Sequence, residues 1–322
     1  MGIKRFAAAC TLAGAALLAL PATSQALDFS YLDFRYTRTQ HPIVLVHGVL
    51  GFDNIGGVVD YFFGVKQALG AGGATVHTVK LSTVDTHEER GEQLLRQLLA
   101  LQAAHGTQRF NLVAHSQGGL AARYVAKVRP DLVASVTTVQ TPHHGSNVAD
   151  WLAKYTVEHP EEGEQLIKLS TELLKALDWL VGASDREHDL IGNVFQLTTS
   201  MSRAWNLRYT EGAPTTPCGS GARVGASGVH YYSAGGARVN TNFLDLSDHL
   251  FGLVAGLGFT NGEANDGLVS SCSSRWGEVL RADYPWNHAD GVNHVMGLRD
   301  FLGPDPLSFY RSHANRLKKA GL

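Results

Sequence analysis

Apolar positions gather into short continuous runs in the first half of the chain, and these runs alternate with helical patterns. The runs at 42–48, 74–80, 110–114 and 132–140 predict strands that are buried on both faces of a parallel sheet. Residues 88–105 and 119–128 predict helices, the first with a stripe of leucines at positions 94, 95, 98, 99 and 101. This alternation predicts an α/β fold with right-handed crossovers.

The alternation stops near residue 150. Residues 163–181 carry apolar side chains at helical spacing, which favours either a core-packing helix or a helix that covers a binding site. The glycine-rich segment after Pro214 predicts strands and loops only, and residues 307–319 predict a closing helix. The pattern alone leaves the role of residues 150–210 open.

Composition predicts one large domain or at most two small ones, since the 322 residues are 44% hydrophobic and 17% charged. A formal net charge of −2 gives no electrostatic footprint for nucleic acid.

The N-terminus has the pattern of a signal peptide. Lys4 and Arg5 precede an apolar stretch over 6–20, Pro21 ends it, and residues 24–26 offer small side chains for cleavage. A membrane anchor is the alternative, but roughly 15 apolar residues are few for a span. We therefore expect residues 1–26 to be removed. The mature chain would then have no transmembrane segment and would be secreted to the extracellular space via the periplasm.

Export changes the interpretation of the cysteines. Cys10 would leave with the signal peptide, and its place early in the apolar stretch disfavours a lipoprotein. Cys218 and Cys272 remain as a pair in an oxidising compartment, which predicts one disulfide; two free thiols are the alternative.

The strongest chemical signal is Ala114-His115-Ser116-Gln117-Gly118-Gly119, between a predicted strand and a predicted helix. A strained strand-to-helix turn of this kind exposes a serine as a nucleophile, and its neighbours must be small because backbones approach closely there. Ala114 stands where the common pattern has glycine. An incidental serine in a plain strand-turn-helix is the alternative.

Further motifs make a resemblance specific: His47-Gly48-Val49-Leu50-Gly51-Phe52, Arg90-Gly91-Glu92-Gln93-Leu94, Asn265-Asp266-Gly267-Leu268-Val269, and Asn287-His288 with Asp290. From about His41 to the C-terminus, the sequence resembles the secreted triacylglycerol lipases of Pseudomonas and Burkholderia. The resemblance implies an α/β-hydrolase fold, with a mostly parallel central sheet, helices on both faces, and a helical lid inserted at about 150–210 into the catalytic domain 27–322.

The resemblance also implies a catalytic triad. Serine needs a neutral imidazole as base and a carboxylate to orient it, in the chain order Ser, Asp, His. Asp266 and His288 follow Ser116 in this order and match the family's positions. The competing histidines are His143, His144, His249 and His294, and Asp266 could instead be a turn former in Asn-Asp-Gly.

Two backbone N–H groups should stabilise the oxyanion. Gln117 directly follows the nucleophile, and the resemblance implies Val49 as the second donor. A plain strand terminus is the alternative interpretation of His47-Gly48.

A structural calcium ion is a further implication of the resemblance. The matching ligands are the carboxylates of Asp245 and Asp290 and the carbonyls of His294 and Leu298, where His294 replaces a common glutamine. Asp245 and Asp290 could instead be ordinary surface acids.

We expect a lipase that acts on lipid or ester substrates at an interface through an acyl-enzyme. The resemblance implies a dedicated folding chaperone as a partner. The alternatives are a short-chain carboxylesterase or polyester depolymerase, an acyltransferase, and a non-catalytic lipid-binding protein.

Overall fold

A computed structural model of the chain describes residues 33–49, 54–55, 59–165, 168, 190–216 and 218–322. The predicted signal peptide lies outside these residues and stays a prediction. No helix of the described residues is long and apolar enough to cross a bilayer.

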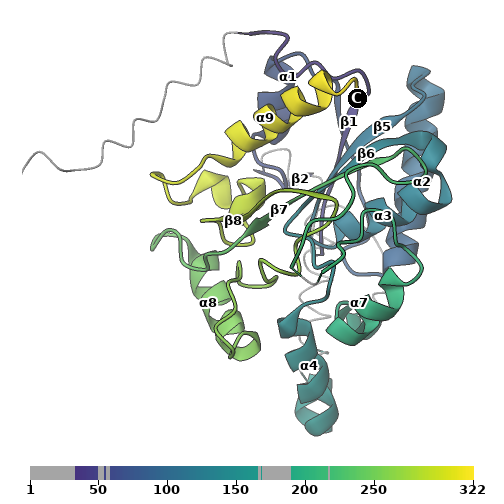
Figure 1. Cartoon of the computed structure of the whole chain (residues 1–322). Coiled ribbons are helices and arrows are strands. Elements are labelled where there is room, and N and C mark those ends of the chain that lie inside the picture. Colours follow the sequence, from purple (N-terminus) through teal and green to yellow (C-terminus); the bar gives the residue numbers. More distant parts are fainter. Residues whose placement is uncertain (1–32, 50–53, 56–58, 166–167, 169–189, 217) are drawn as a thin grey trace, which may run out of the picture.

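A six-stranded parallel sheet forms the centre of the molecule, in the order β4-β1-β5-β6-β7-β8 (Figure 1). The strands are β1 (Ile43–Val46), β4 (Val76–Thr78), β5 (Phe110–His115), β6 (Val133–Val139), β7 (His230–Gly236) and β8 (Glu278–Tyr284). Every residue of β1, β5 and β6 is buried, as their continuous apolar runs predict. A short antiparallel pair, β2 (Asn54–Ile55) and β3 (Val59–Asp60), follows β1.

Helices cover both faces of the sheet, which confirms the predicted layers. On one face, α2 (His87–His105) and α3 (Gly118–Val128) bury Leu94, Leu98 and Val125 against the strands. On the other face, α1 (Val65–Ala71) and α9 (Pro306–Lys319) bury a second apolar cluster (Figure 1).

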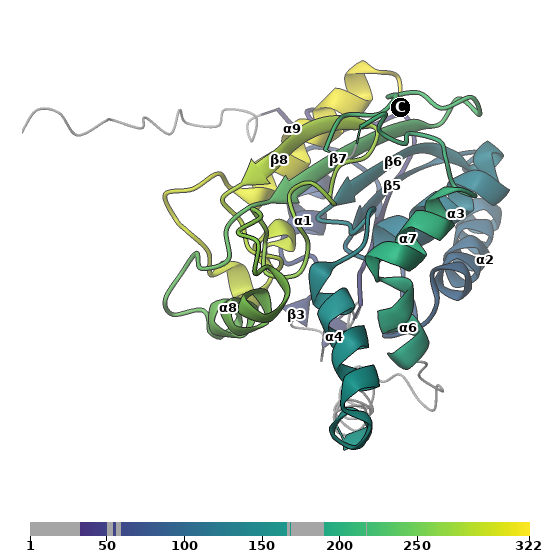
Figure 2. The same cartoon turned by 60° about the horizontal axis from the view of Figure 1, so that its bottom comes forward.

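The remaining helices gather beyond the carboxyl ends of the strands, where α4 and α8 both extend away from the sheet (Figures 1 and 2). They are α4 (Asn147–Glu158), α6 (Leu190–Gln196), α7 (Thr199–Asn206) and α8 (Leu246–Gly258). Residues 160–165 are also helical, but most of the predicted helix at 163–181 lies outside the described residues. The lid therefore stays a prediction.

Helix α8 corrects the prediction of only strands and loops after Pro214. Its three glycines, each costing about 1 kcal/mol in a helix, concealed the helix in the sequence. Asp245 caps its N-terminus by accepting a hydrogen bond from the Ser247 amide at 2.8 Å. Gly258 lies so close to Val148 of α4 that a Cβ there would meet it at 2.8 Å. Packing against α4 thus outweighs the poor helix propensity.

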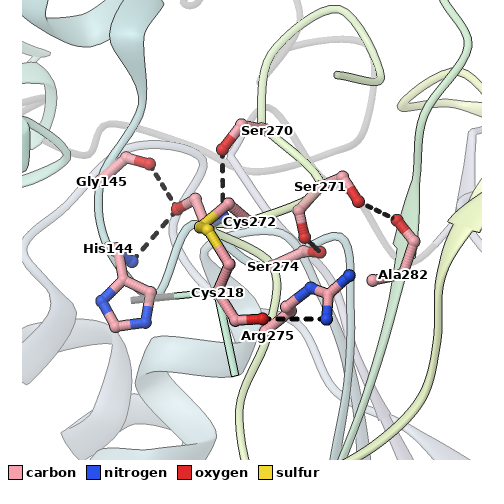
Figure 3. The surroundings of a disulfide bond; sticks show 10 residues. His144, Gly145, Cys218, Ser270, Ser271, Cys272, Ser274, Arg275 and Ala282 are labelled. Atoms are coloured by element: carbon pink, nitrogen blue, oxygen red, sulfur yellow. Dashed lines mark hydrogen bonds between the residues drawn. A yellow bond between two sulfur atoms is a disulfide. The ribbon is translucent and has the colours of Figure 1, made fainter. Parts of the chain in front are cut away.

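Cys218 and Cys272 form a disulfide, as predicted, and free thiols are excluded (Figure 3). The bond joins the segment before β7 to a serine-rich turn that follows Asp266. The Arg275 guanidinium donates a hydrogen bond to the Cys218 carbonyl at 2.9 Å, which ties the same two segments together.

Candidate active site

Ser116 sits in a strained turn between β5 and α3. Its φ is 53°, in the left-handed region that a non-glycine residue rarely adopts. Its amide donates to the Val139 carbonyl at 3.0 Å, and its own carbonyl accepts from the Gly119 amide and the Thr141 hydroxyl. These bonds on both sides hold the strained conformation and present the side chain at the end of the sheet.

Close packing explains the small residues that surround this turn. A Cβ on Gly118 would lie 2.5 Å from the His47 carbonyl oxygen, and one on Gly119 would meet the Thr141 side chain. Ala114 is completely buried in β5, so this position accepts a methyl group in place of the usual glycine. The substitution is therefore compatible with the turn that the sequence predicts.

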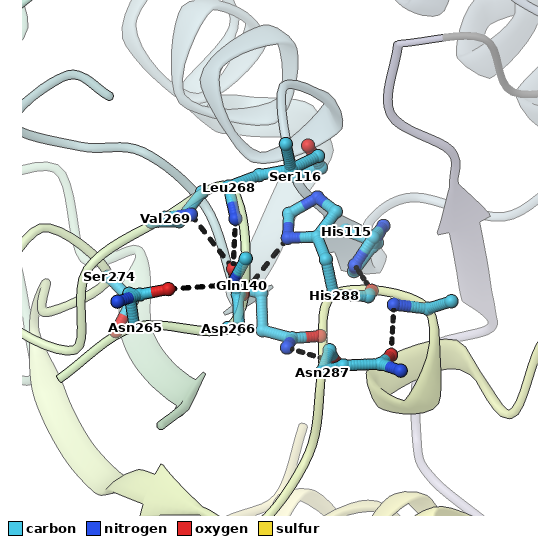
Figure 4. A network of polar contacts seen from close by, with 12 residues as sticks. His115, Ser116, Gln140, Asn265, Asp266, Leu268, Val269, Ser274, Asn287 and His288 are labelled. Carbon is cyan, nitrogen blue, oxygen red and sulfur yellow. Dashed lines mark hydrogen bonds and ion pairs between the residues drawn. The ribbon is translucent and has the colours of Figure 1, made fainter. Parts of the chain in front are cut away.

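The structure brings Asp266 and His288 together across the site. Nδ1 of His288 lies 2.9 Å from Oδ2 of Asp266, and both side chains are buried. The other oxygen of Asp266 accepts the amides of Leu268 and Val269 at 3.0 and 2.8 Å. An ionised carboxylate can only accept hydrogen bonds, so the proton between Asp266 and His288 is placed on Nδ1 of the imidazole. Nε2 of His288 is then free to accept a proton. In Figure 4 the ring of His288 lies between Asp266 and Ser116.

Other histidines have other contacts. His143 is buried against the ring of Trp276, with its Nε2 2.9 Å from the Thr138 hydroxyl. His249 is exposed on α8. Asp266 does form the predicted turn, since its carboxylate binds the amides two and three residues ahead. The turn and the pairing with His288 coexist.

The loop after β1 orients the amide of Val49. The Gly48 carbonyl accepts from Arg90 Nη2 at 3.0 Å and lies 2.9 Å from Nδ1 of His47. Because a trans peptide points its N–H away from its C=O, the Val49 amide points away from Arg90. Gln117 is the N-cap of α3, so its amide lies at the positive end of that helix. The backbone that leads to Val49 passes beside Ser116, since a Cβ on Gly48 would lie 2.6 Å from the Cβ of Ser116, and Gln117 directly follows Ser116 in the chain.

Arg90 organises the loop after β1, a role that its sequence motif alone does not assign to it. It is fully buried and donates to the carbonyls of Ser82, His47 and Gly48. Burial lowers the pKa of Arg90 to about 10. The spacing along the predicted helix could have indicated this role. Arg90 precedes Leu94 by one helical turn, which places its charge on the apolar face of the helix.

The carboxylates of Asp245 and Asp290 are buried, so the interpretation of these two residues as surface acids is wrong. Oδ2 of Asp245 has no hydrogen-bond partner in the described part of the chain. Burial raises the pKa of Asp290 to about 7, and the charges of Asp248 and Asp245 add to this rise. A buried carboxylate oxygen without a hydrogen-bond partner, next to a second buried carboxyl group that the neighbouring negative charges destabilise, is an arrangement that a bound cation would stabilise.

The other two predicted ligands follow Asp290 in the same segment. Asp290 begins a short 3-10 turn (Asp290–Val292), His294 donates its amide to the Ala289 carbonyl at 3.1 Å, and Leu298 follows the next turn (Val295–Gly297). Among the described residues, no three acidic, histidine or cysteine side chains are arranged to hold a metal by themselves. The predicted set relies on backbone carbonyls for half of its ligands, so this finding leaves it open.

Comparison with known proteins identifies the family. Residues 41–260 match the family described as alpha/beta hydrolase fold. The chain is 46% identical over 288 residues to a triacylglycerol lipase of Vibrio cholerae, covering 89% of this chain and 90% of that one. It is 40% identical over 292 residues to a triacylglycerol lipase of Pseudomonas fragi, covering 88% and 98%.

A solved structure confirms the fold independently of close sequence similarity. The crystal structure of Staphylococcus hyicus lipase superposes with a TM-score of 0.60 at 16% identity, covering 87% of this chain and 96% of that chain. The predicted fold class is therefore confirmed. The chain belongs to the α/β-hydrolase family and, within it, to the family of the bacterial triacylglycerol lipases.

Proposed function

We propose that this protein is a secreted lipase that hydrolyses triacylglycerols and related carboxylic esters. The observation that carries the proposal is the strained Ser116 in the turn between β5 and α3, next to the buried His288–Asp266 pair. The relatives named triacylglycerol lipase supply the substrate class.

Acylation would begin at Ser116. Nε2 of His288 takes the hydroxyl proton as Oγ forms a bond to the ester carbonyl carbon, and Asp266 stabilises the resulting imidazolium. The amides of Val49 and Gln117 donate hydrogen bonds to the oxyanion of the tetrahedral intermediate. His288 then returns its proton to the leaving alcohol as the C–O bond breaks, which leaves an acyl ester on Ser116.

Deacylation repeats these steps with water. Nε2 of His288 takes a proton from water as its oxygen attacks the acyl carbon, and the same two amides stabilise the second oxyanion. Collapse of the intermediate releases the carboxylic acid, and His288 returns its proton to Oγ of Ser116. The enzyme is thereby regenerated without any net change of its own groups.

We also propose that Asp245 and Asp290, with the carbonyls of His294 and Leu298, hold a calcium ion. The unpaired carboxylate oxygen of Asp245 and the repelled carboxyl of Asp290 support this assignment. A bound cation would supply charge neutralisation at this site. Asp245 caps α8 and Asp290 follows His288 by two residues, so these side chains would join the helix to the loop of the proposed base.

The disulfide supports export, because such bonds form in oxidising compartments. The proposal has four further parts: a signal peptide at 1–26, a lid at about 150–210, binding at a lipid interface, and assistance by a folding chaperone.

The decisive experiment combines one substitution with a series of substrates. Ser116→Ala should lower kcat for emulsified triacylglycerol by at least about 10⁴-fold, because the nucleophile is lost. Ser220→Ala, which changes an exposed serine, should leave kcat unchanged. Wild-type turnover by Ser116→Ala would refute the mechanism. Hydrolysis of only short, water-soluble esters by the native enzyme would refute the lipase assignment.

A further inference from the structure

Side chains at the carboxyl ends of two neighbouring strands bind consecutive carbonyls of the His288 loop. Nε2 of Gln140, directly after β6, donates to the Asn287 carbonyl at 2.7 Å. Nε2 of His115, the last residue of β5, lies 3.0 Å from the His288 carbonyl oxygen. Figure 4 shows both contacts beside the His288–Asp266 pair. The sequence separations are 147 and 173 residues, so the contacts exist only in the folded chain.

Gln140 is held in an unfavourable backbone conformation. Its φ is 53°, the same as that of Ser116 at the end of the adjacent strand. This conformation costs a non-glycine residue about 1–2 kcal/mol and persists only where the surroundings enforce it. The side chain is fully buried, and a Cβ on Gly236 would lie 2.6 Å from its Nε2. The fold thus keeps Gln140 in a strained conformation, and its side chain fits only because the neighbouring residue is glycine.

The contacts of His115 define its tautomer. A carbonyl oxygen can only accept, so Nε2 of His115 carries the proton and donates to His288. Nδ1 then accepts from the Tyr61 hydroxyl at 2.6 Å, and this hydroxyl accepts the Gly48 amide at 3.3 Å. Burial lowers the pKa of His115 well below its ordinary value, in keeping with a neutral ring. Both ring nitrogens of His115 are therefore hydrogen-bonded to neighbouring groups.

We propose that Gln140 and His115 form a two-point clamp that fixes the backbone of His288 relative to Ser116. The His288 amide also donates to the Asp266 carbonyl at 2.8 Å, so Gln140 and Asp266 hold the Asn287–His288 peptide from opposite sides. His115 adjoins Ser116 in the chain, which couples the position of the proposed base directly to that of the nucleophile. Both clamp residues are positioning residues. The inference rests on the proposed function.

Gln140→Met tests the clamp because it keeps the unbranched shape and removes the donor. We expect kcat on a soluble ester to fall about 10- to 100-fold, since misplacement by about 1 Å can cost that much. KM should stay within about twofold. Thr137→Val is the matched control, because it removes a buried hydrogen bond to His313 from the same strand. It should lower the melting temperature about as much while leaving kcat unchanged.

His115→Phe provides a second test that holds if Gln140→Met fails to fold. It keeps a ring but cannot donate, so kcat should fall again, and His115→Gln, whose amide can donate, should recover part of the loss. The low-field proton resonance of the His288–Asp266 bond should shift in His115→Phe and not in Thr137→Val. Wild-type kcat in the folded clamp variants, or an equal loss in Thr137→Val, would overturn the clamp. Activity that survives Ser116→Ala would instead overturn the proposed function.

Discussion

A Cβ atom on Gly48 would lie 2.6 Å from the Cβ of Ser116 and 3.1 Å from its Oγ. The backbone that leads to Val49 therefore passes directly beside the proposed nucleophile, and only glycine permits this approach. We expect Gly48→Ala to separate the two segments and to lower kcat by about 100-fold, because the proposed oxyanion donor, the Val49 amide, moves with the loop. Initial rates on a soluble ester measure the loss.

Gly70→Ala is the matched control for this substitution. Gly70 lies in α1, and no atom lies within 4 Å of the Cβ that alanine would add. Alanine is better than glycine in a helix by about 1 kcal/mol, so this variant should be fully active and slightly more stable. Wild-type kcat in a folded Gly48→Ala enzyme would contradict the proposed placement of the Val49 amide.

Removal of the proposed calcium ion should destabilise the fold. A ligand present at about 1,000 times its Kd stabilises the native state by about 4 kcal/mol. We therefore expect a chelator to lower the melting temperature of the native enzyme by several degrees, and added calcium to restore it. Differential scanning calorimetry with and without the chelator measures the shift.

Substitutions can assign that shift to the proposed ligands. Asp245→Asn should abolish the difference between chelated and calcium-loaded protein, because it removes the unpaired carboxylate oxygen. Asp283→Asn, on the edge strand β8, changes an exposed acid and should preserve the difference. If the chelator left the melting temperature of the native enzyme unchanged, the proposed calcium ion would be refuted.

Burial explains which parts of the fold the sequence reveals. The strands β1, β5 and β6 are covered on both faces, so each is a continuous apolar run that can be recognised locally. The edge strand β8 has a single buried residue, and its other positions, three of them charged, are partly or fully exposed, so its sequence does not differ clearly from that of a loop. Helix α8 stayed hidden because its glycines oppose helix formation and its packing against α4 is not local.

The proposed catalytic residues and the residues that position them differ in how far the sequence reveals them. Ser116, Asp266 and His288 could be proposed because their local motifs match a known family. Gln140 and His115 could not be given a role, because each acts on a carbonyl that is more than a hundred residues away in the chain. Residues that hold other residues in place leave no local motif, and a folded structure is needed to find them.

The disulfide should contribute substantially to stability. It joins residues that are 54 positions apart, and a closed loop of this length restricts the unfolded chain by about 4 kcal/mol in the chain-entropy model. We expect the double variant Cys218→Ser, Cys272→Ser to lose about this much free energy of unfolding, measured by urea titration. Dithiothreitol should destabilise the native protein and leave the double variant unchanged. Equal sensitivity of both to the reductant would contradict this account.

Acid should also weaken the fold through buried neutral histidines. His313 of α9 is buried against the sheet, where its Nε2 lies 2.6 Å from the Thr137 hydroxyl. Burial, together with the charge of Arg316, lowers the pKa of His313 to about 3. The folded-state pKa is thus below the unfolded value of about 6.5. The stabilisation is therefore complete above pH 6.5 and is lost as the pH falls toward 3.

We expect the free energy of unfolding to fall between pH 7 and pH 5, with His313 alone accounting for about 2 kcal/mol. His313→Gln should be less stable at pH 7 but should lose less stability on acidification. His159→Gln, which changes an exposed residue directly after α4, should keep the wild-type slope because it leaves the core unchanged. Urea titrations across this pH range measure the slopes, and identical slopes for His313→Gln and the native protein would refute the assignment.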